Sequence, residues 1–366
     1  MRFPEFSGEW NKYTINDLAT VVGGGTPDTT VKSYWGGDIQ WFTPSEIGKN
    51  KYVDFSKRTI TRDGLDNSSA KLLPLHTILL SSRATVGECS IASNECTTNQ
   101  GFQSLIAKQC NIDFLYYLIQ TKKKDLIRNA CGSTFLEISA NEIRKIKVAV
   151  PVQNEQEQIA KLLSLIDERI ATQNKIIEDL KKLKSAISER LFKSVKGSTV
   201  LLSDLCDIVK GKQINGENLS DSGNYYVMNG GTEPSGYYDN YNVEASTISI
   251  SEGGNSCGYV QFNTSPFWSG GHCYSIQNIA DKVDNMYLYH YLKSNEDAIM
   301  KLRIGSGLPN IQKKDLAMFK IIVPKIEWQI KISTFLSSLE RKAEIEERIQ
   351  NVMQKQKLYL LQQMFI

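Results

Sequence analysis

The chain has 366 residues, of which 41% are hydrophobic and 23% are charged. This composition is ordinary for a globular protein and excludes an intrinsically disordered chain. The length exceeds what one hydrophobic core usually supports, so we expect two domains with connecting segments. A net charge of +3 does not by itself indicate a nucleic-acid partner, and such a hypothesis must therefore rest on local sites.

Membrane, secretory and metal-binding classes are also disfavoured. The sequence contains no run of about 20 apolar residues, and its first residues lack the apolar core of a secretory signal. The seven cysteines are scattered and never spaced C-x-x-C, and there are only three histidines. We therefore expect a cytoplasmic protein without a membrane segment, a disulfide framework or a metal site.

The chain contains an internal repeat. Residues 114–192 align without a gap with residues 287–365, so that FLYYLI (114–119) corresponds to YLYHYL (287–292). Near the start of each copy, NDLATVVGGG (16–25) corresponds to SDLCDIVKGK (203–212). The segments between these matching ends diverge. One architecture is thus used twice, with different contents.

The divergent segments predict β structure. Short apolar runs such as HTILLSS (76–82) and STISISEGG (246–254) are bounded by Gly, Asn, Pro and Ser clusters. Each β-rich region is followed by a short amphipathic helix near 112–129 or 285–302, and then by a strand that ends at Pro151 or Pro324. The fold class predicted is α+β, with two β-rich domains.

A long helix follows each of these prolines. The first is expected to span 154–196, which at about 1.5 Å per residue gives a length of about 64 Å. In both helices apolar residues recur at alternating steps of four and three, as in a coiled-coil seam. The predicted pairing residues are Ile159, Leu163, Ile166, Ile170, Ile177, Leu180, Ile187 and Leu191 in the first helix, and Ile332, Leu336, Leu339, Met353, Leu360 and Met364 in the second.

Two apolar seams in one chain predict that the helices pair with each other. Tandem copies that pack equivalently are related by a pseudo-twofold axis, and an axis crossing the helices makes them antiparallel. An ordinary two-helix stem without a spacing role is the alternative. The predicted segments are a β-rich domain at 1–150, a helix at 151–197, a second β-rich domain at 198–323 and a second helix at 324–366.

Sequence motifs of common enzymes are missing. The chain has no G-x-x-x-x-G-K-[ST] phosphate loop and no G-x-S-x-G nucleophile turn. No two prolines are adjacent, which excludes the Asn-Pro-Pro-Tyr loop of an amino-methyltransferase. We therefore predict that this chain is not itself an enzyme.

The repeated entry into the helices, VAVPVQNEQEQI (148–159) and IIVPKIEWQI (321–330), points to a family. Further supporting segments are GGGTP (23–27), SSRATVGE (81–88), TNQGFQSL (98–105) and LEISANEIRKIKVAVP (136–151). Together they resemble the specificity subunit of Type I restriction-modification systems. The second copy departs from the pattern because Trp328 lies between Glu327 and Gln329, and its β-rich domain is net acidic.

The resemblance implies a non-catalytic subunit with two target recognition domains. Each domain would read one half of a bipartite site on double-stranded DNA, and the long helices would set the gap between the halves. Family members dock two methyltransferase subunits on these helices. Those partners carry S-adenosylmethionine, so this chain binds no cofactor of its own. A restriction subunit completes the nuclease form of the enzyme.

Candidate DNA contacts in the first domain combine base-edge donors with phosphate donors. Arg83 could pair with guanine or a phosphate, or instead form a salt bridge to Glu88. The amides of Asn99 and Gln100 suit adenine, or they tie a turn to the β core. The other candidates in this domain are Lys32, Tyr34, Lys57, Ser82 and Thr85.

In the second domain the counterpart of the GGGTP turn carries polar residues. We expect DNA contacts from Lys210, Lys212 and Gln213 in this turn, and from Asn229, Thr232, Asn255 and His272 in other loops. Two other functions remain open. One is a DNA-binding regulator that acts without methyltransferase partners, and the other is a tandem β module on a coiled-coil stalk that binds carbohydrate or protein.

Overall fold

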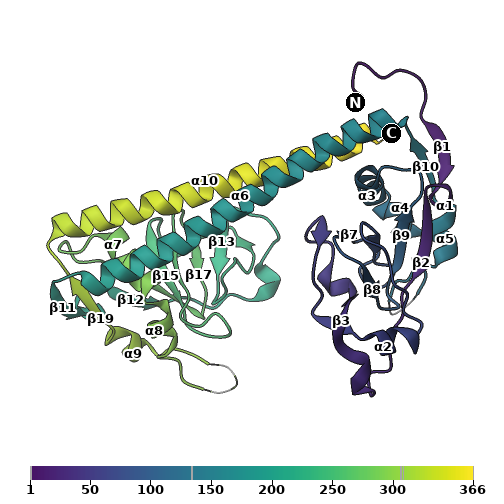
Figure 1. Ribbon diagram of the computed structural model, residues 1–366. Helices are drawn as coiled ribbons and strands as arrows, with labels where there is room; N and C mark the ends of the chain where they lie inside the picture. Colours follow the sequence, from purple (N-terminus) through teal and green to yellow (C-terminus); the bar gives the residue numbers. More distant parts are fainter. Residues whose placement is uncertain (1, 133–134, 306, 308, 366) are drawn as a thin grey trace. The chain divides into compact units, whose positions relative to one another are not determined.

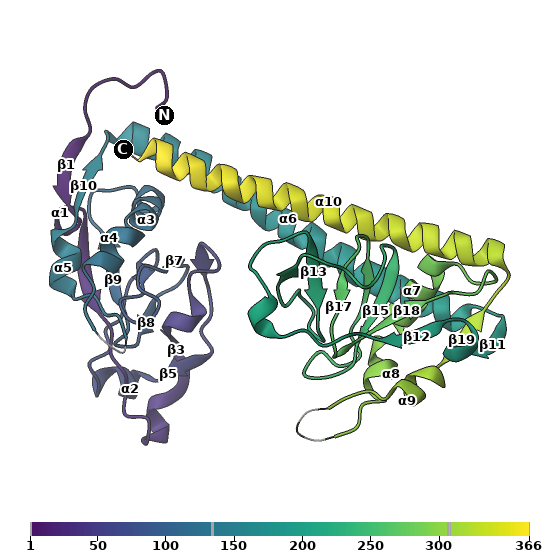
Figure 2. The same ribbon diagram turned by 180° about the vertical axis from the view of Figure 1, so that it is seen from behind.

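Figures 1 and 2 show the computed structural model of the chain, which describes residues 2–132, 135–305, 307 and 309–365. The chain is a mixture of helices and sheets. It divides into two compact units, unit 1 with residues 1–174 and 349–366, and unit 2 with residues 175–348. Each unit thus combines one β-rich region with part of both long helices, which the sequence prediction treats as separate segments.

Unit 1 contains three sheets. A five-stranded sheet has the order β2-β9-β6-β7-β4, a three-stranded sheet the order β5-β3-β8, and β1 pairs with β10. The strands are β1 (Asn11–Thr14), β2 (Ala19–Gly23), β3 (Trp35–Phe42), β4 (Tyr52–Val53), β5 (Arg58–Ile60), β6 (Ile78–Leu80), β7 (Cys89–Ala92), β8 (Cys96–Thr98), β9 (Gln103–Ala107) and β10 (Lys147–Val150).

Short helices complete this unit, and the first long helix leaves it. Asn111 caps α3 by accepting the N–H of Phe114, and the apolar face of α3 joins the main core with β6, β7 and β9. The helices are α1 (Ile15–Leu18), α2 (Arg62–Asp66), α3 (Ile112–Thr121), α4 (Lys123–Arg128), α5 (Ala140–Lys145) and α6 (Gln153–Ser194).

Unit 2 has the same kinds of sheets. A four-stranded sheet has the order β12-β18-β15-β16, a three-stranded sheet the order β14-β13-β17, and β11 pairs with β19. The strands are β11 (Ser198–Leu201), β12 (Asp207–Lys210), β13 (Tyr225–Met228), β14 (Tyr237–Tyr238), β15 (Thr247–Ser251), β16 (Val260–Asn263), β17 (Trp268–Ser269), β18 (Cys273–Gln277) and β19 (Lys320–Val323). Its helices are α7 (Asn285–Ser294), α8 (Glu296–Met300), α9 (Lys313–Ala317) and α10 (Ile326–Met364).

The two units share most of their strand arrangement, although β4 of unit 1 has no counterpart in the four-stranded sheet of unit 2. In each, the three-stranded sheet contains one parallel pair, β3 with β8 and β13 with β17, and the sheet that enters the long helix is antiparallel. Strand order β2-β9-β6-β7 in unit 1 matches β12-β18-β15-β16 in unit 2. The similarity inferred from the matching sequence ends therefore extends through the divergent middles.

A buried glutamine fixes each entry into a long helix. The side chain of Gln156 donates to the carbonyl of Pro151 and accepts the backbone N–H of Asn111. Gln329 donates in the same way to Pro324 and accepts from Asp284. The two N–H donors, Asn111 and Asp284, lie at matched positions before α3 and α7, so the glutamine ties the helix entry to the β-rich region in each copy.

The tryptophan that departs from the family pattern does not disturb this contact. Trp328 occupies the position that Glu155 has in the first copy, and its side chain is 60% exposed. Glu155 is instead buried and forms an ion pair with Arg2, with 2.7 Å between Nε and Oε1. The second copy therefore has an exposed aromatic side chain where the first has a buried, ion-paired carboxylate, and Gln329 stays in place.

The long helices pack together in antiparallel directions within each unit. In unit 1, Lys357 Nζ lies 2.6 Å from Asp167 Oδ1. In unit 2, the same distance separates Lys184 Nζ from Glu340 Oε1. Residue numbers rise along α6 as those of the contacted α10 residues fall, as Lys181 with Glu347 also shows. None of the helices in the described residues has a stretch long and apolar enough to cross a bilayer.

The predicted pairing residues are all buried or half-buried. Ile159 and Leu163 join the core of unit 1 with Met364, and Leu336 joins the core of unit 2 with Phe192. The half-buried positions are Ile166, Ile170, Leu180, Ile187, Leu191, Leu339, Met353 and Leu360. The helix predicted for 154–196 spans Gln153–Ser194 in the structure.

Candidate nucleic-acid interface

In unit 1 strand β3 and the segment that carries the predicted amides both contact the GGGTP turn. Gly25 N–H donates to the carbonyl of Thr98, and the indole N–H of Trp41 donates to the carbonyl of Gly25 over 2.9 Å. A Cβ atom at Gly24 would overlap the backbone of Asn99, so glycine permits this close approach. The turn is therefore held against the segment that contains the predicted amides.

The two amide residues are partly used within the protein. Asn99 Oδ1 accepts the backbone N–H of Gly101 over 2.9 Å, so its side chain closes the turn. Gln100 is exposed, and its Oε1 accepts a hydrogen bond from the hydroxyl of Thr26. Asn99 therefore has the turn-closing role that was the alternative to DNA contact. Gln100 lies at the surface beside the GGGTP segment.

Arg83 lies in an exposed loop after β6. Its Nε is 3.3 Å from Glu137 Oε2, and the backbones of the two residues form an isolated β-bridge. The alternative salt bridge to Glu88 is wrong, because Glu88 pairs with Lys123 instead. Ala84, the next residue, adopts a positive φ of 62° and donates its N–H to the carbonyl of Leu136. The loop is thus pinned on both sides of Arg83 while the guanidinium is about half exposed.

The residues that flank Arg83 differ in exposure. Ser82 is fully buried, and its backbone donates to Gly101 and accepts from Ile138. These two backbone hydrogen bonds tie the end of β6 to neighbouring segments, so they favour a structural role for Ser82. Thr85 is exposed, and its hydroxyl lies 2.9 Å from that of Ser81.

Lys32, Tyr34 and Lys57 lie around the three-stranded sheet of unit 1. Both lysines are exposed, and Tyr34 is half-buried, its carbonyl accepting the N–H of Thr61. Sequence reasoning missed Arg58, whose guanidinium carbon lies 3.6 Å from the ring centroid of Trp35. This cation–π contact holds the Arg58 charge on this sheet, around which the exposed lysines lie, where it could add to phosphate binding. The sequence signal that could have indicated Arg58 is its neighbour Lys57, which is itself a predicted contact.

In unit 2 the counterpart turn is held in the same manner. Gly211 N–H donates to Cys273, and the indole N–H of Trp268 donates to the carbonyl of Lys212 over 2.9 Å. A Cβ at Gly211 would overlap the backbone of Ser269. Both units therefore fix this turn with a tryptophan indole and a glycine in close contact.

Four predicted residues of unit 2 gather beside this turn, and we call them the turn cluster: Lys210, Lys212, Asn229 and His272. Asn229 is half-buried, and its Oδ1 accepts the backbone N–H of His272 over 3.1 Å. Lys212 is exposed, and its backbone N–H donates to Ser269. Gln213, Thr232 and Asn255 are also exposed.

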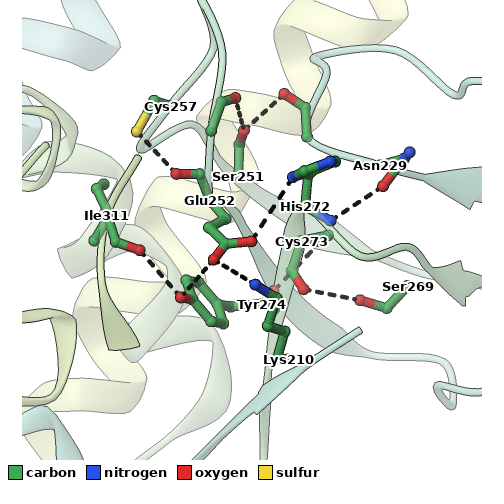
Figure 3. Close-up of polar contacts among 12 residues, drawn as sticks. Lys210, Asn229, Ser251, Glu252, Cys257, Ser269, His272, Cys273, Tyr274 and Ile311 are labelled. Carbon is green, nitrogen blue, oxygen red and sulfur yellow. Dashed lines mark hydrogen bonds and ion pairs between the residues drawn. The ribbon is translucent and has the colours of Figure 1, made fainter. Parts of the chain in front are cut away.

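A carboxylate that sequence reasoning missed lies beneath the turn cluster (Figure 3). Glu252 follows β15, and its Oε1 lies 2.7 Å from Lys210 Nζ and 3.1 Å from the hydroxyl of Tyr274. Its Oε2 lies 3.9 Å from Nδ1 of His272. Burial, followed by the nearby Glu252 charge, raises the pKa of Tyr274, so this hydroxyl stays protonated and donates. The segment ISEGG gave no sign that its glutamate would be buried.

The arrangement offers hydrogen-bond donors and a few positive charges. Across the described residues, no group of three His, Cys, Asp or Glu side chains is placed to hold a metal ion. The exposed arginines, lysines and amides can bind phosphates and base edges.

Comparison with known proteins identifies the family. The family model described as Type I restriction modification DNA specificity domain matches residues 7–182 and again residues 196–355. The chain belongs to this family. Each of its two specificity domains thus begins in one β-rich region and extends into the long helix that follows.

Named relatives agree with this assignment. The specificity subunit of Type I restriction enzyme MjaIX from Methanocaldococcus jannaschii is 39% identical over 48% of this chain and 42% of its own length. That of EcoR124I/EcoR124II from Escherichia coli is 28% identical over 46% and 43%. The chain thus spans less than half the length of these two relatives. The EcoprrI specificity subunit, also from Escherichia coli, is 24% identical over 91% of this chain and 87% of its own length.

Solved structures share the fold of the specificity domains. The S subunit of a Type I restriction-modification system from M. genitalium has a TM-score of 0.66 at 19% identity, covering 100% of this chain and 99% of that one. A chain from a structural study of complex assembly and conformational transition of the type I R-M system has a TM-score of 0.63 at 14% identity, covering 98% of both.

Proposed function

We propose that this chain is the DNA specificity subunit of a Type I restriction-modification system. It binds a bipartite sequence on double-stranded DNA and directs partner subunits to that site. The observation that carries the proposal is the double match of the specificity-domain family to residues 7–182 and 196–355. We expect the chemistry to reside in the partners, with S-adenosylmethionine bound by methyltransferase subunits and none by this chain.

Each unit would read one half of the target. The supporting observation is that both units hold an equivalent turn with a tryptophan indole, Trp41 to Gly25 and Trp268 to Lys212. Predicted base and phosphate donors lie beside both turns, yet their identities differ. A framework that both units share, with different side chains on it, suits two domains that read different half-sites.

The long helices would act as the spacer between the readers. Contacts such as Lys184 with Glu340 and Asp167 with Lys357 support an antiparallel coiled coil. The matched order of elements in the two units supports a pseudo-twofold relation between the copies. In this proposal the helix length sets the gap between the two half-sites.

The outer faces of the helices are the proposed docking sites for two methyltransferase subunits. In unit 1 these faces expose Leu165, Ile349, Val352, Leu358 and Tyr359, and in unit 2 they expose Ile176, Leu183, Phe335, Ile345 and Trp328. The pairing seam already uses the opposite face, so these apolar side chains are free to bury against a partner. A restriction subunit would bind to the complex that results.

Reconstitution tests the proposal. The chain is mixed with cognate methyltransferase subunits, and transfer of labelled methyl groups from S-adenosylmethionine to adenines in duplex DNA is measured. We expect methylation at one bipartite sequence only when the chain is present. Methylation that is equal with and without the chain would exclude a specificity role. Binding of duplex without association with methyltransferase would favour a separate DNA-binding regulator.

A further inference from the structure

Glu252 is a buried acid on the side of unit 2 that carries the turn cluster. Its side chain is only 10% exposed, whereas those of Lys210 and His272 are 54% and 62% exposed. The backbone holds it from both sides, because Glu252 N–H donates to the carbonyl of His272 and its own carbonyl accepts from Ile311. The backbone of Glu252 is therefore fixed, and its carboxylate lies below the exposed side chains of Lys210 and His272.

The two oxygens of this carboxylate are used unequally. Oε1 accepts from the Lys210 ammonium and from the Tyr274 hydroxyl. Oε2 is buried and has no hydrogen-bond partner. A buried carboxylate oxygen without a donor costs free energy, so an acid with a purely structural role would be expected to engage both oxygens. The unmatched oxygen indicates a state in which a further donor arrives.

His272 is the group placed to supply that donor. Its Nδ1 lies 3.9 Å from Oε2, which is too long for a hydrogen bond but short enough to close with a small rotation of the ring. Asn229 fixes the backbone N–H of His272 (Figure 3), while the side chain of His272 is 62% exposed. An imidazolium has a donor on each ring nitrogen and can bridge two acceptors.

We propose that Glu252 is a positioning residue that aims the side chains of Lys210 and His272 at a DNA phosphate. On binding, the imidazole of His272 takes one proton from solvent. Nδ1–H then donates to Glu252 Oε2, and Nε2–H donates to a phosphate oxygen. The inference rests on the proposed DNA-binding function and adds a proton-linked contact in unit 2.

The other titratable groups around the carboxylate do not compete for this proton. Burial raises the pKa of the Cys257 thiol and that of Cys273, the latter to about 11, so both thiols stay neutral near pH 7. Burial likewise raises the pKa of Tyr274. Among the side chains around the carboxylate, His272 is the one whose ring nitrogen faces Oε2, at 3.9 Å.

The remaining histidines provide controls for a pH experiment. The chain has three histidines, and desolvation lowers the pKa of His290 to about 4, so this residue stays neutral at mildly acidic pH. His76 is exposed in unit 1 and has a positive φ of 65°, which asparagine also tolerates. His76→Asn is therefore a matched change of an exposed histidine outside the turn cluster.

The test measures binding of the full chain to a fluorescein-labelled, mixed-sequence duplex at low salt, at about pH 6 and about pH 8. For the wild type and for His76→Asn we expect affinity on the order of five- to tenfold higher at the lower pH. Glu252→Gln and His272→Gln should each reduce this ratio to near unity. Because Glu252→Gln also removes a negative charge near DNA, the ratio and not the absolute affinity is the readout.

The possible outcomes test the inference about Glu252 and the proposed DNA-binding function separately. If Glu252→Gln keeps the wild-type ratio, Glu252 has no positioning role and the inference fails while DNA binding stands. If the wild type binds no duplex at low salt, the proposed function fails as well. Should Glu252→Gln not fold, His272→Gln decides alone, because it alters an exposed side chain, and an unchanged ratio in that variant overturns the inference.

Discussion

Nε of Arg83 lies 3.3 Å from Oε2 of Glu137, and both side chains are about half exposed. An exposed ion pair contributes about 0–1 kcal/mol, because solvent screens the charges and two side chains lose freedom. A guanine edge or a phosphate could therefore replace Glu137 as the partner of Arg83 at a small cost in free energy. The pair can hold Arg83 in an extended position until DNA replaces the carboxylate.

Replacing Arg83 with alanine should weaken binding to the cognate duplex by about 1–3 kcal/mol if the guanidinium reads a base. Binding to unrelated duplex should change much less, since base contacts are specific to the sequence. Fluorescence anisotropy with both duplexes measures the difference. Arg128→Ala is the matched control, because Arg128 forms a similar surface pair with Asp125. An equal loss on both duplexes would assign Arg83 to phosphate binding.

Packing of the long helices can be tested within a few residues of α6. Leu163 is fully buried, whereas Leu165 is 54% exposed. Leu163→Ala should lower the free energy of unfolding by about 2–5 kcal/mol, through lost burial and a cavity. Leu165→Ala should change it by less than about 0.5 kcal/mol. Equal effects in urea denaturation would contradict the packed face described for α6.

Unit 2 should lose stability in mild acid because of His290. This residue is buried on α7, its Nε2 lies 2.9 Å from Ser337 Oγ, and desolvation lowers its pKa from 6.5 to about 4. Between these values the unfolded chain binds a proton that the folded chain does not. The stabilisation is thus complete above about pH 6.5 and falls as pH decreases, by up to about 3 kcal/mol.

Denaturant midpoints at about pH 7 and about pH 5 measure this effect. His290→Gln keeps a polar group near Ser337 but cannot titrate, so its midpoint should depend less on pH than that of the wild type. The exposed His76→Asn should retain the wild-type dependence. Parallel pH profiles for all three proteins would show that His290 is not the source.

Lys212 should contribute to DNA binding without regard to sequence. It is exposed in the turn cluster, and a lone lysine contacts phosphates as a point charge. Lys212→Ala should weaken binding to cognate and unrelated duplexes alike, and should reduce the slope of log affinity against log salt by about one. Lys182→Ala is the control, because Lys182 pairs with Glu178 on the surface of α6. A loss confined to the cognate duplex would instead make Lys212 a base reader.

Local periodicity explains what the sequence could predict. Steps of four and three place residues on one helix face whatever surrounds them, so Ile159, Leu163 and Ile177 of the predicted seam are all buried. The repeated P-x-x-x-x-Q tract marked the helix entries, and the structure adds the reason, since Gln156 and Gln329 each bind the preceding proline carbonyl. These features depend on residues near one another in the chain.

The site was harder to predict because its contacts join distant segments. The choice of Glu137 over Glu88 as the partner of Arg83 depends on which loop lies beside β6, and no local pattern encodes that. Burial of Glu252 likewise arises where the ends of β12, β15 and β18 meet. The assignment of particular residues to bases or phosphates stays a prediction.

The most direct test of the central proposal is a genome-wide map of methylated adenines in cells with the gene for this chain intact and deleted. We predict that one motif, made of two half-sites with a constant gap, is methylated only when the chain is present. Restoring the chain from a plasmid should restore the same motif. An identical methylation map in both strains would contradict the proposal that this chain selects the target.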